Sequence, residues 1–364
     1  MPRWIPIALV LCCTTSAYAQ KDRVRYRDRA AEKDIDQEGD IVESSGGVEF
    51  TGADKKKKFI PAADVYRIEY TTLDALRLDI GKIEGGDGAK DPAKAATFYA
   101  DKLKSSGTAP EKTKRFLAFR EAYWLAKVAD AKANPDEFKA EAKKAAEKIA
   151  AFNQANGKTW EQWQLGRTAA RQAGEVGEWK AAAEIFRKLS AVPDAPAEAK
   201  TEAMLSQASM LIRGGFVNEA KTVLADAAKE KGLTAGGKER LAIYQAALPA
   251  ASRKEIDPND VNAVANAKAK VTDATRLIEA SIASAKEPTT RGIGYAMLGE
   301  VHFASGLDRD AMWHYLWVDT VYNQDKDEQI LAVSRLVDVF NRLGERDGEK
   351  NRSEQFRERL LKVR

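Results

Sequence analysis

Apolar and polar positions follow two different periods along this chain, and the change falls near residue 70. Between residues 22 and 70, apolar residues alternate with polar ones, which is typical of short strands with one buried face. From Leu73 to the end, apolar residues recur at spacings of three and four, and Gly or Pro interrupts the pattern, as in a series of helices. We therefore expect a mainly helical chain behind a small N-terminal β module.

Five short strands are predicted in the β module. They cover residues 23–27, 39–43, 47–51, 58–60 and 65–70. Residues 44–47, Ser-Ser-Gly-Gly, predict a tight hairpin turn because glycine accepts positive backbone dihedrals. Residues 61–64 predict a single helical turn between the last two strands. Five short strands suit a small barrel, and the pattern resembles SH3-like or Sm-like barrels.

Four consecutive lysines, Lys55 to Lys58, lie between two of these strands. Like charges repel one another and prefer water, which indicates a solvated hairpin tip. The alternative is a contact for an acidic wall polymer, nucleic acid or lipid head group. The net charge of the whole chain is only +4, which does not indicate nucleic-acid binding.

The helical part contains one stretch with a specific repeat spacing. Its residues are Tyr295, Leu298, Gly299, Gly306, Ala311 and Tyr315. This spacing resembles the tetratricopeptide repeat, in which an aromatic residue, Leu-Gly, a turn glycine, alanine and a second aromatic residue build a helix hairpin. The resemblance implies an α-solenoid of stacked hairpins, each of which covers the apolar face of its neighbours.

The spacing also has a physical reading that does not depend on the resemblance. Gly299 would allow two helices to cross closely, Gly306 would let the chain leave the first helix in a left-handed conformation, and Ala311 with Tyr315 would pack back on the first helix. Similar pairs recur at Ala182/Phe186 after Gly177, at Ala220/Leu224 after Gly215, and more faintly at Ala95/Tyr99, Ala145/Ile149 and Ala274/Ile278.

The predicted organisation has four parts. They are a signal peptide at 1–19, the β module at 22–70, a linker and the start of the first helix pair at 71–91, and the helical repeat array at 92–364 with an insertion near 250–262. We expect a long helix after Pro258. A charged final helix with Phe356, Leu360 and Leu361 on one side is expected to face solvent as a cap.

The N-terminus has the features of a secretory signal peptide. Arg3 precedes an apolar stretch, residues 4–13, and Ala17-Tyr18-Ala19 provides small residues for cleavage after Ala19. The stretch is shorter than the ~20 residues that a spanning helix needs, which disfavours an uncleaved anchor. Lipidation is disfavoured because Leu11 stands before Cys12, where a small residue is expected. The chain is therefore expected to be exported, periplasmic or secreted, without cysteines after cleavage.

The resemblance implies that a partner docks on the concave side, which the first helix of each pair lines. The positions carried over are Arg167, Arg171, Ser209, Arg213, Glu300, Phe303, Asp338 and Asn341. These side chains are mostly polar and of mixed charge, which suits a polar or charged segment. The alternative is that they are ordinary solvated side chains.

Other conspicuous side chains are interpreted as packing. This applies to the tryptophans of the helical part, Trp124, Trp160, Trp163, Trp179, Trp313 and Trp317. The two histidines, His302 and His314, are expected at packing or edge positions rather than as a ligand pair. We expect no metal and no cofactor.

Catalytic motifs of serine hydrolases, zinc proteases and cysteine nucleophiles do not occur in the sequence. The favoured function is therefore a non-catalytic scaffold that binds a peptide or protein partner. The alternative is an accessory subunit or an enzyme acting on envelope polymers through carboxylates. A weaker third possibility, a structural or storage role, is suggested by the alanine and lysine rich residues 139–148.

Overall fold

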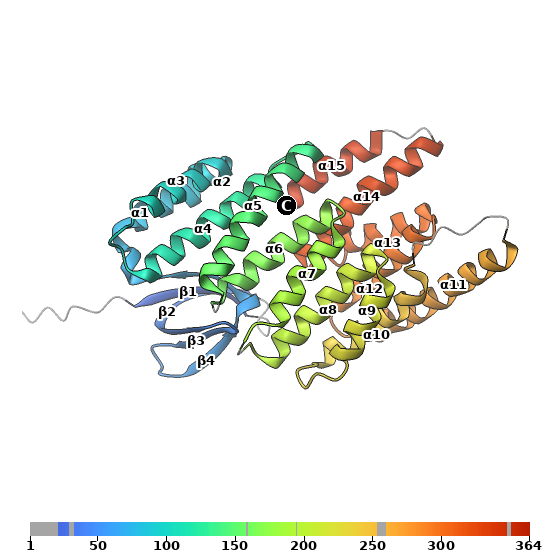
Figure 1. Cartoon of the computed structure of the whole chain (residues 1–364), viewed down its shortest axis with the longest axis horizontal. Helices are drawn as coiled ribbons and strands as arrows, with labels where there is room; N and C mark the ends of the chain where they lie inside the picture. Colours follow the sequence, from blue (N-terminus) through green and yellow to red (C-terminus); the bar gives the residue numbers. More distant parts are fainter. Residues whose placement is uncertain (1–20, 29–32, 158, 194, 253–259, 348–350) are drawn as a thin grey trace, which may run out of the picture.

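The structure is a computed structural model that describes residues 21–28, 33–157, 159–193, 195–252, 260–347 and 351–364. The chain is mainly helical, and a five-stranded antiparallel sheet precedes the helices (Figure 1). The prediction of a mainly helical chain behind an N-terminal β module is therefore confirmed. The predicted signal peptide, residues 1–19, lies outside the described residues.

The sheet has the strand order β4-β3-β2-β1-β5, and all neighbours are antiparallel. Its strands are β1 (Asp22–Asp28), β2 (Lys33–Ser44), β3 (Gly47–Thr51), β4 (Lys57–Pro61) and β5 (Val65–Glu69). A short 3-10 helix, η1 (Ala62–Asp64), joins β4 to β5, where the sequence predicts one helical turn. All five predicted strands are present.

Strand β2 is much longer than the predicted 39–43. Its first half pairs with β1 and its second half pairs with β3. The first half escaped prediction because Ile35 is its only apolar residue, so no alternation is visible. Ion pairs between β1 and β2 support this half instead, such as Arg23 Nε to Asp36 Oδ1 at 2.6 Å.

The lysine run is only partly a hairpin tip. Lys57 and Lys58 belong to β4, where they form ion pairs with Glu49 at 2.6 Å and with Asp28 at 2.7 Å. Lys55 has a positive φ of 60° in the turn before the strand. Half of the run is therefore neutralised within the β module.

The stretch predicted as a linker and the start of the first helix pair, residues 71–91, is helical from Thr71 to Lys90. It contains η2 (Thr71–Leu76), α1 (Arg77–Lys82), the π-helical turn η3 (Ile83–Asp87) and α2 (Gly88–Lys90). Glu84 bonds Arg67 of β5 at 2.5 Å, Arg120 at 2.7 Å and the hydroxyl of Tyr99. These tertiary contacts order a glycine-rich segment whose local sequence favours flexibility.

The remaining helices follow in close succession, and consecutive ones pack against each other. They are α3 (Pro92–Lys104), α4 (Glu111–Asp130), α5 (Pro135–Asn156), α6 (Glu161–Glu175), α7 (Trp179–Ser190), α8 (Ala197–Gly214), α9 (Val217–Ala227), α10 (Ala235–Ala247), η4 (Leu248–Ala250), α11 (Val261–Ser284), α12 (Pro288–Ala304), α13 (Asp308–Thr320), α14 (Lys326–Asp347) and α15 (Asn351–Val363). Among the described helices, none is both long enough and apolar enough to cross a membrane.

The long helix expected after Pro258 is α11. It begins at Val261, and the side chain of Asp260 caps it by accepting a hydrogen bond from the Ala263 amide at 2.9 Å. Most of the predicted insertion, residues 253–259, lies outside the described residues.

Three helix pairs, α6–α7, α8–α9 and α12–α13, share one turn geometry. Gly177, Gly215 and Gly306 have φ of 78°, 78° and 72°. In each turn the residue after the glycine donates its amide to the carbonyl five positions earlier, at 2.8, 2.9 and 2.9 Å. This Schellman geometry needs a left-handed residue, which explains the glycine. The left-handed turn predicted at Gly306 is confirmed, and the other two glycines repeat it.

The close crossing predicted at Gly299 is also present. A Cβ atom there would lie 2.5 Å from the ring of Tyr315, which leaves no space for a side chain. The predicted alanine positions and their partners four residues later are all buried: Ala95/Tyr99, Ala145/Ile149, Ala182/Phe186, Ala220/Leu224, Ala274/Ile278 and Ala311/Tyr315. Small and large side chains therefore alternate where paired helices meet.

The β module docks on the helices through its β2–β3 turn. Ser45 donates to the Pro193 carbonyl at 2.9 Å and accepts from the indole of Trp163 at 2.7 Å through its own carbonyl. A Cβ at Gly46 would lie only 1.9 Å from Pro196. One buried apolar cluster extends from β1 into α14, so the sheet and the helices share a core.

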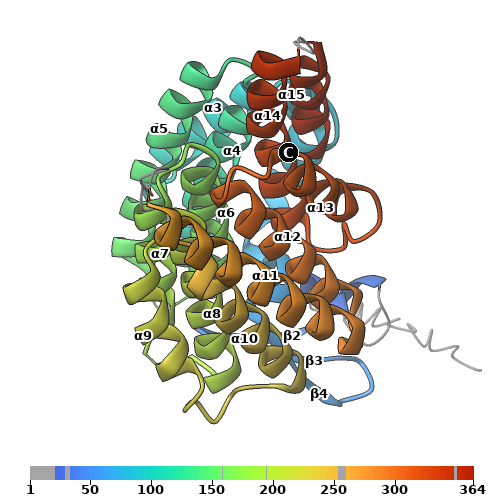
Figure 2. The same cartoon turned by 90° about the vertical axis from the view of Figure 1, so that its right-hand side faces the viewer.

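The C-terminal helices turn back on earlier ones. Helix α14 packs on α6 as well as on α12, α13 and α15, and Figures 1 and 2 show α14 and α15 near α4 to α6. Arg364 donates to Glu175 at 2.8 Å and to the Lys132 carbonyl at 3.0 Å, and its own carbonyl accepts from Lys127 at 2.8 Å. Helix α15 therefore exposes Arg352, Glu354, Glu358 and Lys362 as a cap would, but its C-terminal end also binds α6 and the α4–α5 turn.

Candidate ligand pocket on the inner side of α6 and α14

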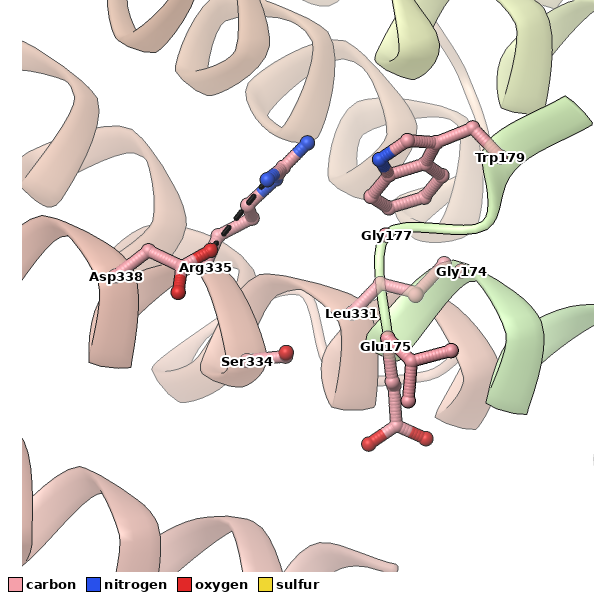
Figure 3. A pocket seen from close by; sticks show the side chains of 9 residues that line it. Gly174, Glu175, Gly177, Trp179, Leu331, Ser334, Arg335 and Asp338 are labelled. Atoms are coloured by element: carbon pink, nitrogen blue, oxygen red, sulfur yellow. Dashed lines mark hydrogen bonds and ion pairs between the residues drawn. The ribbon is translucent and has the colours of Figure 1, made fainter. Parts of the chain in front are cut away.

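The first helices of several successive pairs contact one another and α14 contacts α6, and we call the side where they meet the inner side. The contacts that define it are α4 with α6, α8 with α10, α10 with α12, α12 with α14, and α14 with α6. A hollow of about 230 Å³ opens between α14 and the α6–α7 turn (Figure 3). Its lining residues are Gly174, Glu175, Val176, Gly177, Trp179, Leu331, Ser334, Arg335 and Asp338.

The hollow owes its shape to the α6–α7 turn. The left-handed Gly177 ends α6 and brings Trp179, the first residue of α7, over one wall. The guanidinium of Arg335, from α14, lies 4.7 Å from the Trp179 ring and 4.8 Å from the ring of Phe303. A cation between two aromatic faces is held by their quadrupoles and by dispersion.

Arg335 is also anchored by carboxylates. Its Nε and Nη2 atoms donate to Glu300 at 2.9 and 3.1 Å, and Nη1 lies 3.4 Å from Asp338. Burial disfavours the charge, but Glu300 outweighs it and raises the pKa of Arg335. In Figure 3 the Arg335 and Asp338 side chains lie side by side on α14. Asp338 is half exposed, so part of its carboxylate faces solvent.

The same polar network continues through α8. Arg213 is fully buried, and its guanidinium contacts Glu300 at 3.3 Å and Glu328 of α14. Its Nε lies 3.4 Å from the hydroxyl of Ser209. Burial raises the pKa of Glu328. Removing one partner of such a buried pair leaves an uncompensated charge, so these contacts tie α8, α12 and α14 together.

A second buried arginine joins α4, α6 and α14. Arg171 donates to both oxygens of Asp130 at 2.9 Å and to Glu175, and its Nε lies 3.6 Å from Asp327. Arg167 reaches the same Asp327 at 2.9 Å. Burial opposes ionisation of Asp130, but the Arg171 charge outweighs this effect and lowers the pKa of Asp130.

The predicted concave residues therefore converge, but most do not form an open surface. Arg171, Ser209, Arg213, Glu300 and Phe303 are 0 to 4% exposed. The expectation of a solvent-facing row is wrong for these five, which are buried between the helices. Helix α14 supplies Asp327, Glu328 and Arg335 as partners for Arg171, Arg213 and Glu300. Partner binding by any of them stays a prediction.

The other three predicted positions remain accessible to solvent. Arg167 is partly exposed, and Asp338 and Asn341 are exposed on α14. Only Asp338 lines the hollow.

Sequence reasoning missed the residues that complete the network. They are Asp130, Glu175, Asp327, Glu328, Arg335 and Trp179. Most lie outside the repeat positions that the resemblance carries over. The one signal available was the acidic start of α14, where Asp325 caps the amides of Asp327 and Glu328 at 3.0 and 3.3 Å.

A second hollow of about 630 Å³ adjoins the junction with the β module. It is lined by Glu111, Lys112, Arg115, Gln154, Ala155, Asn156, Gly157, Thr159 and Pro193. Arg115 contacts Glu43 of β2 and donates to Glu161 at 3.0 Å, and the indole of Trp160 donates to Glu43 at 3.1 Å. These bonds join the β module to α4 and α6.

The tryptophans divide into two groups. Trp124, Trp160, Trp163 and Trp179 are buried, as predicted. The packing interpretation is wrong for Trp313 and Trp317, whose exposed fractions are 60% and 44%. Both lie on α13, one turn apart.

No protein-family model, curated protein or solved structure matches this chain. The candidate site is therefore interpreted from its own geometry. Within the described residues, no group of three or more His, Cys, Asp or Glu side chains could hold a metal ion. What the inner hollow does offer is a hydroxyl at Ser334, a half-exposed carboxylate at Asp338 and an indole wall at Trp179.

Proposed function

We propose that this protein is a non-catalytic interaction scaffold, a solenoid of tetratricopeptide-like hairpins that binds a peptide or protein partner on its inner side. The observation that carries the proposal is the repeated turn at Gly177, Gly215 and Gly306, with one φ region and one hydrogen-bond pattern. A turn reused at three pairs indicates a repeated hairpin rather than unrelated helices. Consecutive packing of the helices supports the same reading.

The binding surface in this proposal is the hollow between α14 and the α6–α7 turn. The neighbouring inner side is filled by its own ion pairs, which leaves this hollow as the accessible part of the predicted surface. Trp179 offers apolar contact, while Ser334 and Asp338 offer a hydrogen-bond donor and a negative charge. A polar segment with a positive or donor group fits these features.

The β module is proposed to be SH3-like. Support comes from the ladder order β4-β3-β2-β1-β5 and from the short 3-10 helix between β4 and β5. Export to the periplasm or beyond is proposed from the N-terminal sequence alone, where Arg3, the apolar residues 4–13 and Ala17-Tyr18-Ala19 stand in the order of a signal peptide.

A comparative pull-down with the exported full chain tests the scaffold. Ser334→Trp should fill the hollow and Asp338→Lys should reverse its charge, so both should lose a stoichiometric partner that the wild-type protein recovers. Asp226→Lys on α9 is the matched control, because Asp226 is about as exposed as Asp338 but lies outside the hollow. It should retain the partner.

Retention of the partner by all three variants would exclude the hollow as the binding surface. Turnover of an envelope polymer by the purified protein, abolished by a carboxylate substitution, would instead support the enzyme alternative. The two readings therefore give different results with the same preparations.

A further inference from the structure

Five aromatic rings form a continuous series on and just after the α12–α13 pair, and we call them the aromatic row. They are Tyr295, His302, His314, Trp317 and Tyr322. The His302 and His314 ring centroids are 4.9 Å apart, and Tyr295 lies 6.2 Å from His314. Tyr295 also stacks nearly parallel on Trp317 at 5.8 Å and on Tyr322 at 5.2 Å. The row thus ends at the exposed Trp317.

Two carboxylates flank this row. Thr275 of α11 bonds His302 at 3.1 Å, which places this face of α11 against the row, and Glu279 stands one helical turn further on the same face. Asp310 stands one turn before His314 on α13. The charges of Glu279 and Asp310 both act to raise the pKa of His302, so both lie within electrostatic reach.

Neither carboxylate is neutralised within the described part of the chain, where Glu279 and Asp310 form no ion pair. Arg291 of α12 donates to the Ala285 carbonyl at 3.0 Å and also acts electrostatically on Tyr295, so its single positive charge offsets part of the two carboxylate charges. This contrasts with the inner side, where every buried carboxylate described above has an arginine partner.

The histidines add no positive charge to the row at neutral pH. Burial lowers the pKa of His302, and burial together with the neighbouring His302 lowers the pKa of His314 to about 4. The row is therefore a neutral aromatic surface between two anionic groups. Because the faces of aromatic rings carry negative potential, both the rings and the carboxylates favour a positively charged ligand.

We propose that the aromatic row binds a soluble quaternary ammonium ion, with Trp317 and Tyr295 contacting its methyl groups and Glu279 and Asp310 supplying negative charge. A quaternary ammonium ion has no N–H groups, so aromatic faces satisfy it fully. An arginine side chain would bring five N–H donors that ring faces cannot match. The proposal does not depend on partner binding in the inner hollow.

Titration calorimetry of the full exported chain with choline chloride tests this proposal. The comparison ligand is 3,3-dimethyl-1-butanol, which has the shape of choline without its charge. Choline should bind at one site at least about tenfold more tightly than the neutral alcohol, because the aromatic and carboxylate contributions both require the charge. Equal affinity would show a merely apolar surface and overturn the proposal.

Variants locate the site. Trp317→Leu and Glu279→Gln should each weaken choline binding about tenfold. Trp313→Leu is the control, since Trp313 is still more exposed on the same helix but lies outside the row. It should bind choline like the wild type.

Three further results would reject the proposal. They are choline affinity unchanged in both Trp317→Leu and Glu279→Gln, tighter binding of arginine methyl ester than of choline, and binding to phosphatidylcholine vesicles without binding of free choline. Unchanged far-UV circular dichroism of each variant shows that a loss of affinity does not come from unfolding. Because both variants change exposed side chains, they should fold normally.

Discussion

The inner side and the aromatic row lie on the same helix pair, α12–α13, yet they use charge in opposite ways. On the inner side Glu300 is buried and shared by Arg213 and Arg335. On the aromatic row Glu279 is exposed and has no ion-pair partner among the described residues. The comparison teaches that one surface holds the fold together with its charges, whereas the other keeps its charges available to a ligand.

The largest effect should come from breaking the inner network. Arg213→Met would leave Glu300 and Glu328 buried with one partner fewer, which should cost about 3–5 kcal/mol of unfolding free energy. Denaturant unfolding followed by circular dichroism measures this loss. Arg187→Met removes an exposed ion pair with Glu184 and should leave the midpoint unchanged. If both variants unfolded at the same denaturant concentration, the buried ion pairs of Arg213 would stabilise the fold no more than the exposed pair of Arg187.

A smaller effect should follow from moving α13 off α12, which disturbs both surfaces at once. Gly299→Ala would bring a methyl group against the Tyr315 ring, and we expect a loss of about 1–3 kcal/mol. The control Gly81→Ala meets no atom within 4 Å and should stabilise the protein slightly, since it lies inside α1. Thermal unfolding and near-UV circular dichroism of the two variants check this prediction.

The histidines of the aromatic row should make stability depend on pH. The pKa of His314 is about 4 in the folded protein, below the ordinary 6.5, so the unfolded chain binds more protons between these values. Stability should therefore fall as pH drops from 6.5 to 5, by about 1 kcal/mol after allowance for partial exposure. His314→Phe should flatten this part of the curve. If the unfolding free energy changed equally with pH in the wild type and the variant, groups other than His314 would cause the pH dependence.

The smallest effect should come from the exposed tryptophans. Trp313→Leu and Trp317→Leu should each change the unfolding free energy by less than about 0.5 kcal/mol, because neither side chain is buried. Trp163→Leu, buried beside the β module, should lose several times more. Urea unfolding curves of the three variants distinguish surface from core. A large loss of unfolding free energy in Trp317→Leu would show that the aromatic row stabilises the fold by packing.

Local features of the fold were predictable from sequence. Strand β3 matches its predicted bounds, and Gly306 and Gly299 play the parts that their spacing predicted. Each depends on short-range rules of alternation, left-handed conformation or close approach. The first half of β2 was missed because charged pairs, rather than apolar alternation, support its ladder.

The candidate site was less predictable, because it depends on how the pairs stack. The resemblance placed Arg171 and Arg213 on a common side, and in the structure they pair with consecutive carboxylates of α14, Asp327 and Glu328. It could not show that α14 returns to α6, since that contact depends on the accumulated angle between pairs rather than on any local pattern. The sequence period also could not predict that Trp317 is exposed and Trp179 buried. The exposure of a helical residue depends on which neighbouring helix covers it.

The return of α14 to α6 also bears on how the chain folds. Arg167 and Asp327 are 160 positions apart, and Lys127 bonds a carbonyl 237 positions away. Contacts this distant can form only after a long loop has closed, which slows their formation. Hairpins along the chain can assemble early from local contacts, while the guanidinium groups between them stay hydrated until the last helices arrive. The ion pairs that α14 and α15 form with earlier helices should therefore form late in folding.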